Sequence, residues 1–367
     1  MSWRPIRAMS IGNDRPKVLS NDGLAIAPGT DMPTTTRSVP ESQPRKTAEI
    51  PETMHAAAID RFGGPEVLTI HTLPVPHLDD GEVLIQIDTA GVGPWDADIR
   101  AGWYPEGTPR FPLVLGTDGA GIVAAVTGGM RRLKVGDQVY SYSWANPKGG
   151  FYAEYVAVVA DKVAPIPKPL DLHHAGAIAT TGLTAIQGID NALQIKLDET
   201  LIIHGAAGGV GTLAVQFAKL RGARVLATAS GEDGLALVRR LGADAAVDGR
   251  REDIVAAARA FAPDGVDAVL GLAGGEALDQ CVDALKSGGR LAHPNGVEPA
   301  PKRRPGIRII PYDAVSGVED FKYLNMAVEA AKIEVPIAAT FDLGNAAQAH
   351  ERLEAGHVLG KIVLRVT

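Results

Sequence analysis

A glycine-rich turn between a predicted strand and a predicted helix is the part of this sequence whose residue types and spacing most clearly suit chemistry. Gly205, Gly208 and Gly211 recur at every third position, after the apolar residues 201–203 and before an amphipathic helix predicted at 212–221. Glycines at this spacing let the chain turn sharply, let its backbone approach a ligand, and let the helix pack on the strand. Free backbone amides and the positive end of the helix dipole then attract an anion. The pattern predicts that the turn binds the pyrophosphate of a dinucleotide through Gly205, Ala207, Gly208, Gly209, Val210 and Gly211.

The composition favours a small-molecule partner. Of 367 residues, 46% are hydrophobic and 22% are charged, and the net charge of -7 offers no general attraction to nucleic acid or to an anionic membrane. No apolar run has the length of a membrane span, and the N-terminus has no signal-peptide core, so we expect a cytoplasmic protein. A lone cysteine, Cys281, excludes an intrachain disulfide and a multi-cysteine zinc site, and its helical apolar surroundings predict a buried structural thiol.

The elements that must position the turn divide the chain into four segments. Residues 1–53 are rich in Pro, Ser, Thr and Arg without periodicity, and we expect a disordered extension. Residues 54–177 contain short strands separated by Gly, Pro and Asp turns, which predicts a β-rich domain. Residues 178–312 alternate strands and helices, which is typical of a doubly wound parallel sheet in an α/β protein. Residues 313–367 are expected to return to the β-rich domain.

Five stretches of the sequence are similar to those of a known family. In chain order they read GVGPWDADIRAG at 91–102, PLVLGTDGAG at 112–121, GGFYAEY at 149–155, AAGGVG at 206–211 and GHVLGKIVL at 356–364. On these residues the chain resembles the zinc-independent quinone oxidoreductase branch, which includes zeta-crystallin, of the medium-chain dehydrogenase/reductase superfamily. The resemblance implies a GroES-like catalytic domain, an inserted Rossmann domain, an active site in the cleft between them, and a homodimer.

The positions of the zinc ligands in related alcohol dehydrogenases look like Gly93, Thr117 and Asp118 in this sequence. Without thiolate or imidazole at these positions a zinc site has too few ligands, so we expect no metal. Without a Lewis acid, reversible oxidation of a simple alcohol is disfavoured, whereas acceptors that delocalise negative charge remain. The expected reaction is hydride transfer from NADPH to a quinone or an α,β-unsaturated carbonyl.

The proton donor of this reaction is open between two residues. Family members often carry Tyr where this chain has Asp98, and a carboxyl group donates a proton only if burial raises its pKa. Tyr104 offers a phenol nearby, or else it is an aromatic wall residue. Trp95 shapes the substrate pocket or packs in the core. Asp96 and Arg100, four residues apart, are expected to pair with each other as structural supports.

The preference for NADPH or NADH depends on the charges at the end of the strand that follows the glycine-rich turn. An enzyme that prefers NADH usually has an acid at the strand tip, and the tip at 226–231 has none, which favours NADPH over NADH. Ser230 can donate to a 2′-phosphate, and Arg250 or Arg239 can neutralise it. The acids that follow at 232 and 233 oppose this interpretation, as does the replacement of the family's usual Lys and Tyr by Gly234 and Gly249.

Further cofactor contacts are implied by the resemblance. Thr184 corresponds to the residue that approaches the nicotinamide, and Lys361 either reaches the cofactor or is an exposed strand lysine. The positions that follow later strands at the cofactor crevice are Leu272, Ala273 and Gly296. Among the histidines, His204 is expected to be bonded to backbone at a strand end, and no chemistry is assigned to His357.

Two other functions remain open at the level of sequence. An enoyl-thioester reductase would use the basic segment 302–308 to dock a phosphopantetheine arm, although such a run is more often a solvated loop. A nucleotide-binding redox sensor with little turnover would keep the fold and lose the chemistry, and the altered donor position at Asp98 is compatible with it.

Overall fold

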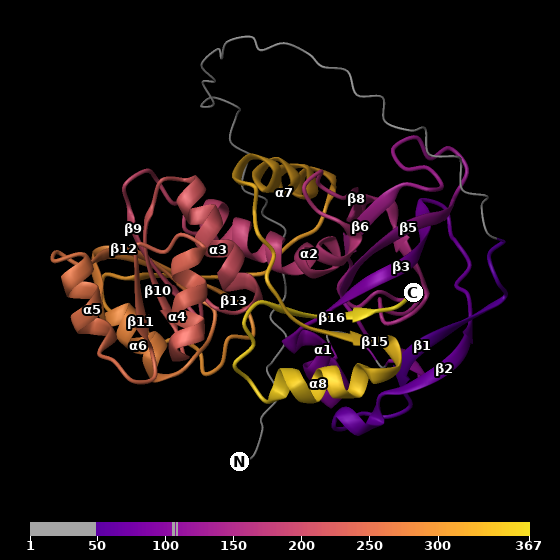
Figure 1. Ribbon diagram of the computed structural model, residues 1–367, viewed down its shortest axis with the longest axis horizontal. Coiled ribbons are helices and arrows are strands. Elements are labelled where there is room, and N and C mark those ends of the chain that lie inside the picture. Colours follow the sequence, from indigo (N-terminus) through magenta and orange to yellow (C-terminus); the bar gives the residue numbers. More distant parts are fainter. Residues whose placement is uncertain (1–48, 105–106, 108) are drawn as a thin grey trace, which may run out of the picture. The chain divides into compact units, whose positions relative to one another are not determined.

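A six-stranded parallel sheet carries the glycine-rich turn in the computed structural model, which describes residues 49–104, 107 and 109–367 (Figure 1). Its strand order is β11-β10-β9-β12-β13-β14, and every neighbouring pair is parallel. The strands are β9 (Thr200–His204), β10 (Arg224–Ala229), β11 (Ala245–Asp248), β12 (Val266–Gly271), β13 (Leu285–Pro294) and β14 (Arg308–Tyr312). The helices between them are α3 (Gly209–Leu220), α4 (Gly231–Arg240), α5 (Ile254–Phe261) and α6 (Glu276–Asp283).

The apolar run at the start of this sheet explains why β9 is central. Leu201, Ile202 and Ile203 are fully buried, because helices cover both faces of the sheet and leave no polar side for alternation. With β10 on one side of β9 and β12 on the other, the strand order reverses beside β9. Ligands of open parallel sheets bind at such a reversal, outside the carboxyl ends of the strands. The parallel doubly wound sheet expected from the sequence is therefore confirmed.

The β-rich part contains a seven-stranded sheet and a three-stranded sheet. The larger has the order β15-β16-β3-β5-β6-β8, with β7 paired to β3, and the smaller has the order β2-β1-β4. The strands that precede the parallel sheet are β1 (Thr53–Ile59), β2 (Thr69–Pro74), β3 (Glu82–Val92), β4 (Leu113–Val114), β5 (Asp118–Val126), β6 (Gln138–Tyr142), β7 (Tyr155–Val159) and β8 (Val163–Pro165). The last two strands are β15 (Ile337–Asp342) and β16 (Lys361–Arg365), and β16 pairs with β3 in antiparallel fashion.

The chain also has helices that do not lie between the strands of the parallel sheet. They are α1 (Pro94–Ala101), α2 (Leu172–Gln187), α7 (Val318–Ala331) and α8 (Ala346–Glu354). Helix α2 packs against β3, β5 and α3, so the boundary expected at 177/178 falls inside a continuous helix. Helix α7 packs on α2, α3 and β8, and only after it do β15, α8 and β16 join the β-rich part. Of the extension expected at 1–53, residues 1–48 lie outside the described residues.

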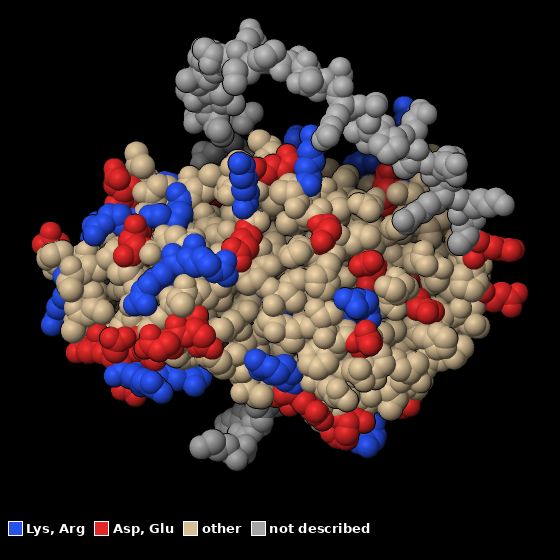
Figure 2. Space-filling view, viewed as in Figure 1, with Lys and Arg blue, Asp and Glu red and all other residues tan. Residues whose placement is uncertain are grey.

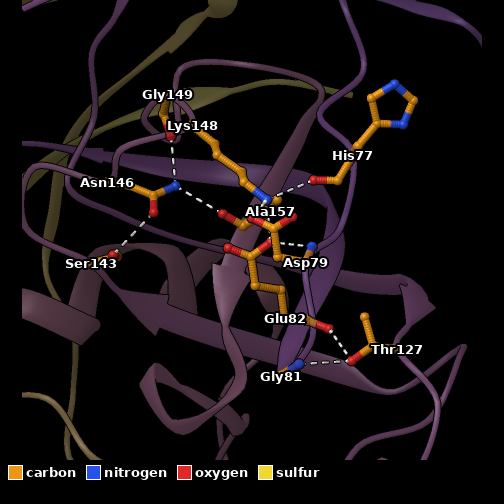
Figure 3. A network of polar contacts seen from close by, with 10 residues as sticks. All are labelled: His77, Asp79, Gly81, Glu82, Thr127, Ser143, Asn146, Lys148, Gly149 and Ala157. Atoms are coloured by element: carbon orange, nitrogen blue, oxygen red, sulfur yellow. Dashed lines mark hydrogen bonds and ion pairs between the residues drawn. The ribbon is translucent and has the colours of Figure 1, made fainter.

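A polar network fixes the loop between β6 and β7 (Figure 3). Lys148 Nζ lies 2.8 Å from Asp79 Oδ2 and 2.6 Å from Glu82 Oε2, and it donates to the carbonyl oxygen of His77 at 2.9 Å. Asn146 Nδ2 donates to two backbone carbonyl oxygens, those of Gly149 and Ala157, at 2.7 and 2.9 Å. These bonds hold in place the loop that carries Trp144, whose ring packs against that of Trp95.

The surface matches the composition. On the face shown in Figure 2, acidic and basic side chains both occur and neither kind covers it. Within the described residues no helix is long and apolar enough to cross a membrane. Cys281 is fully buried on α6, and burial raises the pKa of its thiol to about 12, so the expected structural thiol is confirmed.

Candidate active site

The glycine-rich turn has the geometry that a close approach requires. Gly205 has a φ of +79°, in the left-handed region that favours glycine, and Gly208 is the N-cap of α3. A Cβ at Gly211 would lie 2.4 Å from the carbonyl oxygen of Gly205, so only glycine lets the helix lie this close to the strand. The C-terminal segment is tied to the same turn, because the amide of Gly360 donates to the carbonyl oxygen of Ala207 at 2.9 Å.

One cavity of about 530 Å³ brings most of the expected site residues together. Its lining includes residues of both parts of the fold: Trp95, Asp98, Thr184, Gly205, Gly208, Gly209, Val210, Gly211, Leu272, Ala273, Gly296 and Lys361. Tyr104 is not among the described residues that line it, and its ring packs instead at the edge of the apolar cluster that fills the β-rich part.

Trp95 lines the cavity at the start of α1, and two further indoles pack with it. The ring of Trp95 meets that of Trp144 edge to face at 5.7 Å, and Trp144 in turn meets Trp103 at 5.6 Å. A Cβ at Gly296 would lie 2.8 Å from Cζ3 of Trp95, so the indole lies directly against the loop that follows β13. Trp95 therefore shapes the cavity and packs at the same time.

Asp98 lies near the end of α1 on the wall of the cavity. The residue as a whole is exposed, but its carboxyl group is partly withdrawn from water, and this desolvation raises its pKa while Arg100 lowers it. Since desolvation is the larger effect, the protonated form gains stability at this position.

A buried cluster of charges lies beneath the cavity. Asp96 and Asp118 are both fully buried, and Lys361, only 7% exposed, places Nζ 3.9 Å from Asp118 Oδ1. Asp96 Oδ2 accepts from the amide of Gly93 at 2.9 Å, and Asp118 Oδ2 accepts from the amide of Thr180 at 2.9 Å. Burial raises the pKa of Asp96 to about 7, against the attraction of the Lys361 ammonium. Lys361 is thus a buried residue of the site and not an exposed strand lysine.

The expected pair between Asp96 and Arg100 is wrong. Arg100 points the other way and forms an ion pair with Glu354 and a 3.0 Å hydrogen bond with Nδ1 of His350, both on α8. Its Nε also donates to the carbonyl oxygen of Gly63 at 3.1 Å. The side chain of Asp96 caps the start of its own helix instead, because the capping oxygen lies three residues after Gly93.

A second cavity of about 450 Å³ lies on the other side of the glycine turn. Ser230 and Arg250 line it, as the sequence led us to expect for a 2′-phosphate site, together with Ala207. His357, to which we assigned no role from the sequence, also lines it: Nδ1 lies 3.3 Å from Ser230 Oγ, and Nε2 lies 2.9 Å from an oxygen of Asp233.

His204, at the end of β9, is structural. Its Nδ1 lies 2.8 Å from the hydroxyl of Thr228 on β10, so its partner is a side chain and not the backbone that we expected. Burial lowers the pKa of His204 to about 4, which keeps the imidazole neutral near pH 7. The same hydroxyl accepts from the amide of Gly205 at 3.2 Å, so this pair fixes the start of the glycine turn.

No metal centre is evident in the part of the chain that the structure describes, since nowhere in it do three or more His, Cys, Asp or Glu side chains converge. Of the three positions compared with zinc ligands, Gly93 has no side chain and Asp118 is bonded to Thr180. Gly93 and Asp118 therefore do not supply the thiolate or imidazole ligands that a zinc site usually has.

Sequence reasoning missed Thr180 and His357. Thr180 lies on α2, where nothing in the local pattern separates it from Thr181 and Thr184, yet its amide holds Asp118. In the sequence, His357 is a histidine between Gly356 and Gly360 with no recognisable motif around it. Its partner Asp233 lies 124 residues earlier, so the pair could not be predicted.

Comparison with known proteins agrees with this architecture. Residues 79–168 match the family model for the alcohol dehydrogenase GroES-like domain, and residues 241–364 match the model described as zinc-binding dehydrogenase. The quinone oxidoreductase of Rattus norvegicus is 30% identical over 331 residues, which cover 85% of this chain and 97% of that protein. The NADPH-dependent alkenal/one oxidoreductase of Arabidopsis thaliana is 32% identical and covers 86% of this chain and 81% of its own length.

A solved structure shows the same fold. The Escherichia coli quinone oxidoreductase, crystallised in complex with NADPH, superposes with a TM-score of 0.76 at 26% identity, covering 85% of this chain and all of that one. In this chain the cavity lies within an α/β fold whose parallel sheet is joined to a GroES-like domain. The chain is therefore an oxidoreductase that belongs to the quinone oxidoreductase branch of the medium-chain dehydrogenase/reductase superfamily.

Proposed function

We propose that this oxidoreductase uses NADPH, in preference to NADH, to reduce a quinone or an α,β-unsaturated carbonyl without zinc. The observation that carries the proposal is one cavity lined both by the glycine turn and by Trp95 and Asp98. A cofactor on the turn and an acceptor against the indole would share this space, which is the requirement for direct hydride transfer. The Arabidopsis relative is named for NADPH and for alkenals and alkenones, which supports the same pairing.

The residues of the turn fit a dinucleotide. A Cβ at Gly208 would find its nearest neighbour at 3.6 Å, so the backbone there is open to a phosphate. The amides of Gly208, Gly209 and Val210 would hold the pyrophosphate, with Lys361 beside them. Ser230 and Arg250 would hold the 2′-phosphate, and the nicotinamide end would lie among Thr184, Leu272, Ala273 and Gly296. When bound, the reduced nicotinamide supplies the hydride.

The choice of acceptor follows from the missing zinc ligands. A simple ketone needs a strong electrophile at its oxygen, and this site has no set of ligands to hold a metal there. A quinone or an enone spreads the incoming charge over a conjugated system, so positioning and hydrogen bonds are enough. The flat aromatic face of Trp95 suits a planar conjugated acceptor.

Asp98 is the proton donor that the geometry favours. It lines the cavity, and desolvation raises its pKa, which favours the protonated form that a proton donor needs. Tyr104 is not among the described residues that line the cavity, and it packs against the apolar cluster of the β-rich part. We therefore assign the donor role to Asp98 and substrate positioning to Trp95.

The two alternatives have less support. In the basic segment expected to dock a thioester, Lys302 and Arg304 already form ion pairs with Asp279 and Asp283 on α6. A redox sensor would bind the nucleotide without turnover, and only an assay separates it from a reductase. A cytoplasmic homodimer remains our proposal from the family resemblance.

The experiment that tests the proposal follows oxidation of NADPH and NADH in the presence of quinones, alkenals or enoyl thioesters, with and without a chelator. We expect turnover with quinones or alkenals, faster with NADPH, and unchanged by the chelator. Turnover confined to thioesters would support the first alternative, and binding without turnover would support the sensor. Loss of activity on chelation would refute zinc independence.

A further inference from the structure

His357 contacts two side chains at the rim of the second cavity. Its Nε2 lies 2.9 and 3.1 Å from the two carboxylate oxygens of Asp233, in the first turn of α4, and its Nδ1 lies 3.3 Å from Ser230 Oγ. Ser230 follows β10, the strand whose tip meets the adenosine ribose in dinucleotide-binding sheets. The imidazole therefore lies where a substituent on that ribose would be recognised.

The backbone holds His357 in this place. Its φ of +49° is in the left-handed region, which a residue with a side chain adopts only where surrounding contacts maintain it. Arg352 supplies two such contacts, because its guanidinium donates to the carbonyl oxygens of Gly356 and His357 at 2.8 and 3.1 Å. The bond from Gly360 to Ala207 fixes the other end of the segment.

Charges of both signs surround the imidazole. Asp233 is the carboxylate in direct contact, and its hydrogen bond with His357 is the main reason that its pKa is lowered. The other charged groups near this rim are Glu232 on α4, Asp248 on β11, Arg250 on the cavity wall and Arg352 on α8. Asp248 is engaged by the amides of Gly231 and Arg250, whereas Asp233 accepts from the amide of Gly234 and is the carboxylate that the imidazole contacts directly.

We propose that the His357–Asp233 pair selects between an adenosine 2′-phosphate and a free 2′-hydroxyl according to the protonation of the imidazole. When His357 carries both protons, it neutralises Asp233 and directs Nδ1–H, beside Ser230, to a phosphate oxygen. When it is neutral, the Asp233 carboxylate repels a phosphate and can accept from a ribose hydroxyl. The proton comes from the solvent, so binding of the 2′-phosphate takes up one proton and binding of the 2′-hydroxyl takes up none.

This inference rests on the proposed cofactor, and it uses Asp233, one of the two acids that oppose NADPH in the sequence analysis. An acid at position 233 and the glycines at 234 and 249 leave the cavity short of the usual cations. The imidazole arrives from a segment more than a hundred residues later and supplies a cation at that place. Because the charge of an imidazole depends on pH, the selection follows pH.

The test is calorimetric titration of the full chain with 2′,5′-ADP and with 5′-AMP between about pH 6.5 and 8.5, where a phosphate is already mostly a dianion. We expect the affinity for 2′,5′-ADP to fall with rising pH, by up to about tenfold per pH unit, as for any binding step coupled to one proton. The affinity for 5′-AMP should stay nearly constant. Titration in buffers of different ionisation enthalpy should report proton uptake for 2′,5′-ADP alone.

Two variants separate the parts of the pair. His357→Asn should weaken 2′,5′-ADP by about tenfold at the low end of this range and abolish its pH dependence, with 5′-AMP unaffected. Asp233→Asn should strengthen 2′,5′-ADP at the high end, because the repelling carboxylate is gone. An unchanged pH dependence in His357→Asn would overturn the inference while leaving the proposed cofactor intact. Failure of both nucleotides to bind the native chain would overturn the proposed cofactor and this inference with it.

Discussion

A carboxylate placed at Gly209 tests the proposed phosphate site directly. Gly209 is the first residue of α3, and it does not have the positive φ that would reserve the position for glycine. A Cβ there would lie 3.2 Å from Cγ2 of Thr181, 3.4 Å from the carbonyl oxygen of Gly360 and 3.6 Å from Cδ of Lys361. Thr181 would have to shift by only a few tenths of an ångström, so the fold should tolerate Gly209→Asp. The main effect of the substitution is then electrostatic repulsion of the bound phosphate.

The size of that effect follows from Coulomb's law. Two unit charges about 4 Å apart repel by about 4 kcal/mol at the effective dielectric of about 20 that suits groups near a protein surface. Because about 1.4 kcal/mol is tenfold in an equilibrium constant, full repulsion would weaken binding by about a thousandfold. The cavity is open to solvent and salt screens part of the interaction, so we expect Gly209→Asp to weaken NADP⁺ by a hundredfold to a thousandfold.

Gly209→Asn is the matched control, since it has nearly the same size without the charge. Calorimetry or quenching of intrinsic fluorescence gives the dissociation constants, and thermal denaturation confirms that both variants are folded. The Asn variant should bind NADP⁺ no more than about tenfold more weakly than the native chain. Equal losses in the two variants would mean that the effect is steric, and unchanged affinity in the Asp variant would refute the placement of the pyrophosphate.

Three further predictions concern packing and proton transfer. Gly211→Ala should lower the free energy of unfolding by about 1–3 kcal/mol in thermal or chemical denaturation, because its Cβ would meet the carbonyl oxygen of Gly205 at 2.4 Å; an equally stable variant would contradict the close packing of α3 on β9. Asp98→Asn should reduce kcat by about a hundredfold or more, and it should abolish the decline in activity that the native enzyme shows as pH rises through the raised pKa of Asp98. Tyr104→Phe should retain most of the activity. If instead Tyr104→Phe lost activity and Asp98→Asn kept it, the donor would be Tyr104. Asp96 holds a proton to about pH 7 when folded and to about pH 4 when unfolded, so the folded state binds more protons between these values and stability should fall as pH rises across them. Asp96→Asn should flatten that part of the stability profile, and an unchanged profile would mean that another group produces it.

The parallel sheet and the glycine turn could be predicted because their signals are local. An apolar run of the length of β9, three glycines and an amphipathic helix follow one another within about twenty residues. The geometry of the turn depends on few distant contacts, so the order of elements was enough to place Gly205 and Gly208.

The contacts that complete the site could not be predicted, because they join residues far apart in the chain. Arg100 was paired with Asp96 on helical spacing, but the carboxylate that it meets is Glu354, 254 positions later. His357 gained a role only once the C-terminal segment was seen against the glycine turn. Tyr104 was a reasonable donor on proximity in sequence, yet the chain turns after α1 and carries its ring into an apolar cluster.

The buried charges beneath the cavity give a physical reason for the proposed independence from zinc that the sequence alone lacked. A Cβ at Gly93 would lie 3.3 Å from Lys361 Nζ, so the absence of a side chain at this position is what leaves room for the ammonium. Oδ1 of Asp118 lies 3.9 Å from the same ammonium, and its Oδ2 accepts a hydrogen bond from the amide of Thr180. A divalent ion would have to approach a fixed positive charge with one carboxylate already engaged and no thiolate or imidazole to compensate. Gly93 and Asp118 thus support the proposed independence from zinc in two ways, because they lack its usual ligands and because they adjoin the ammonium of Lys361.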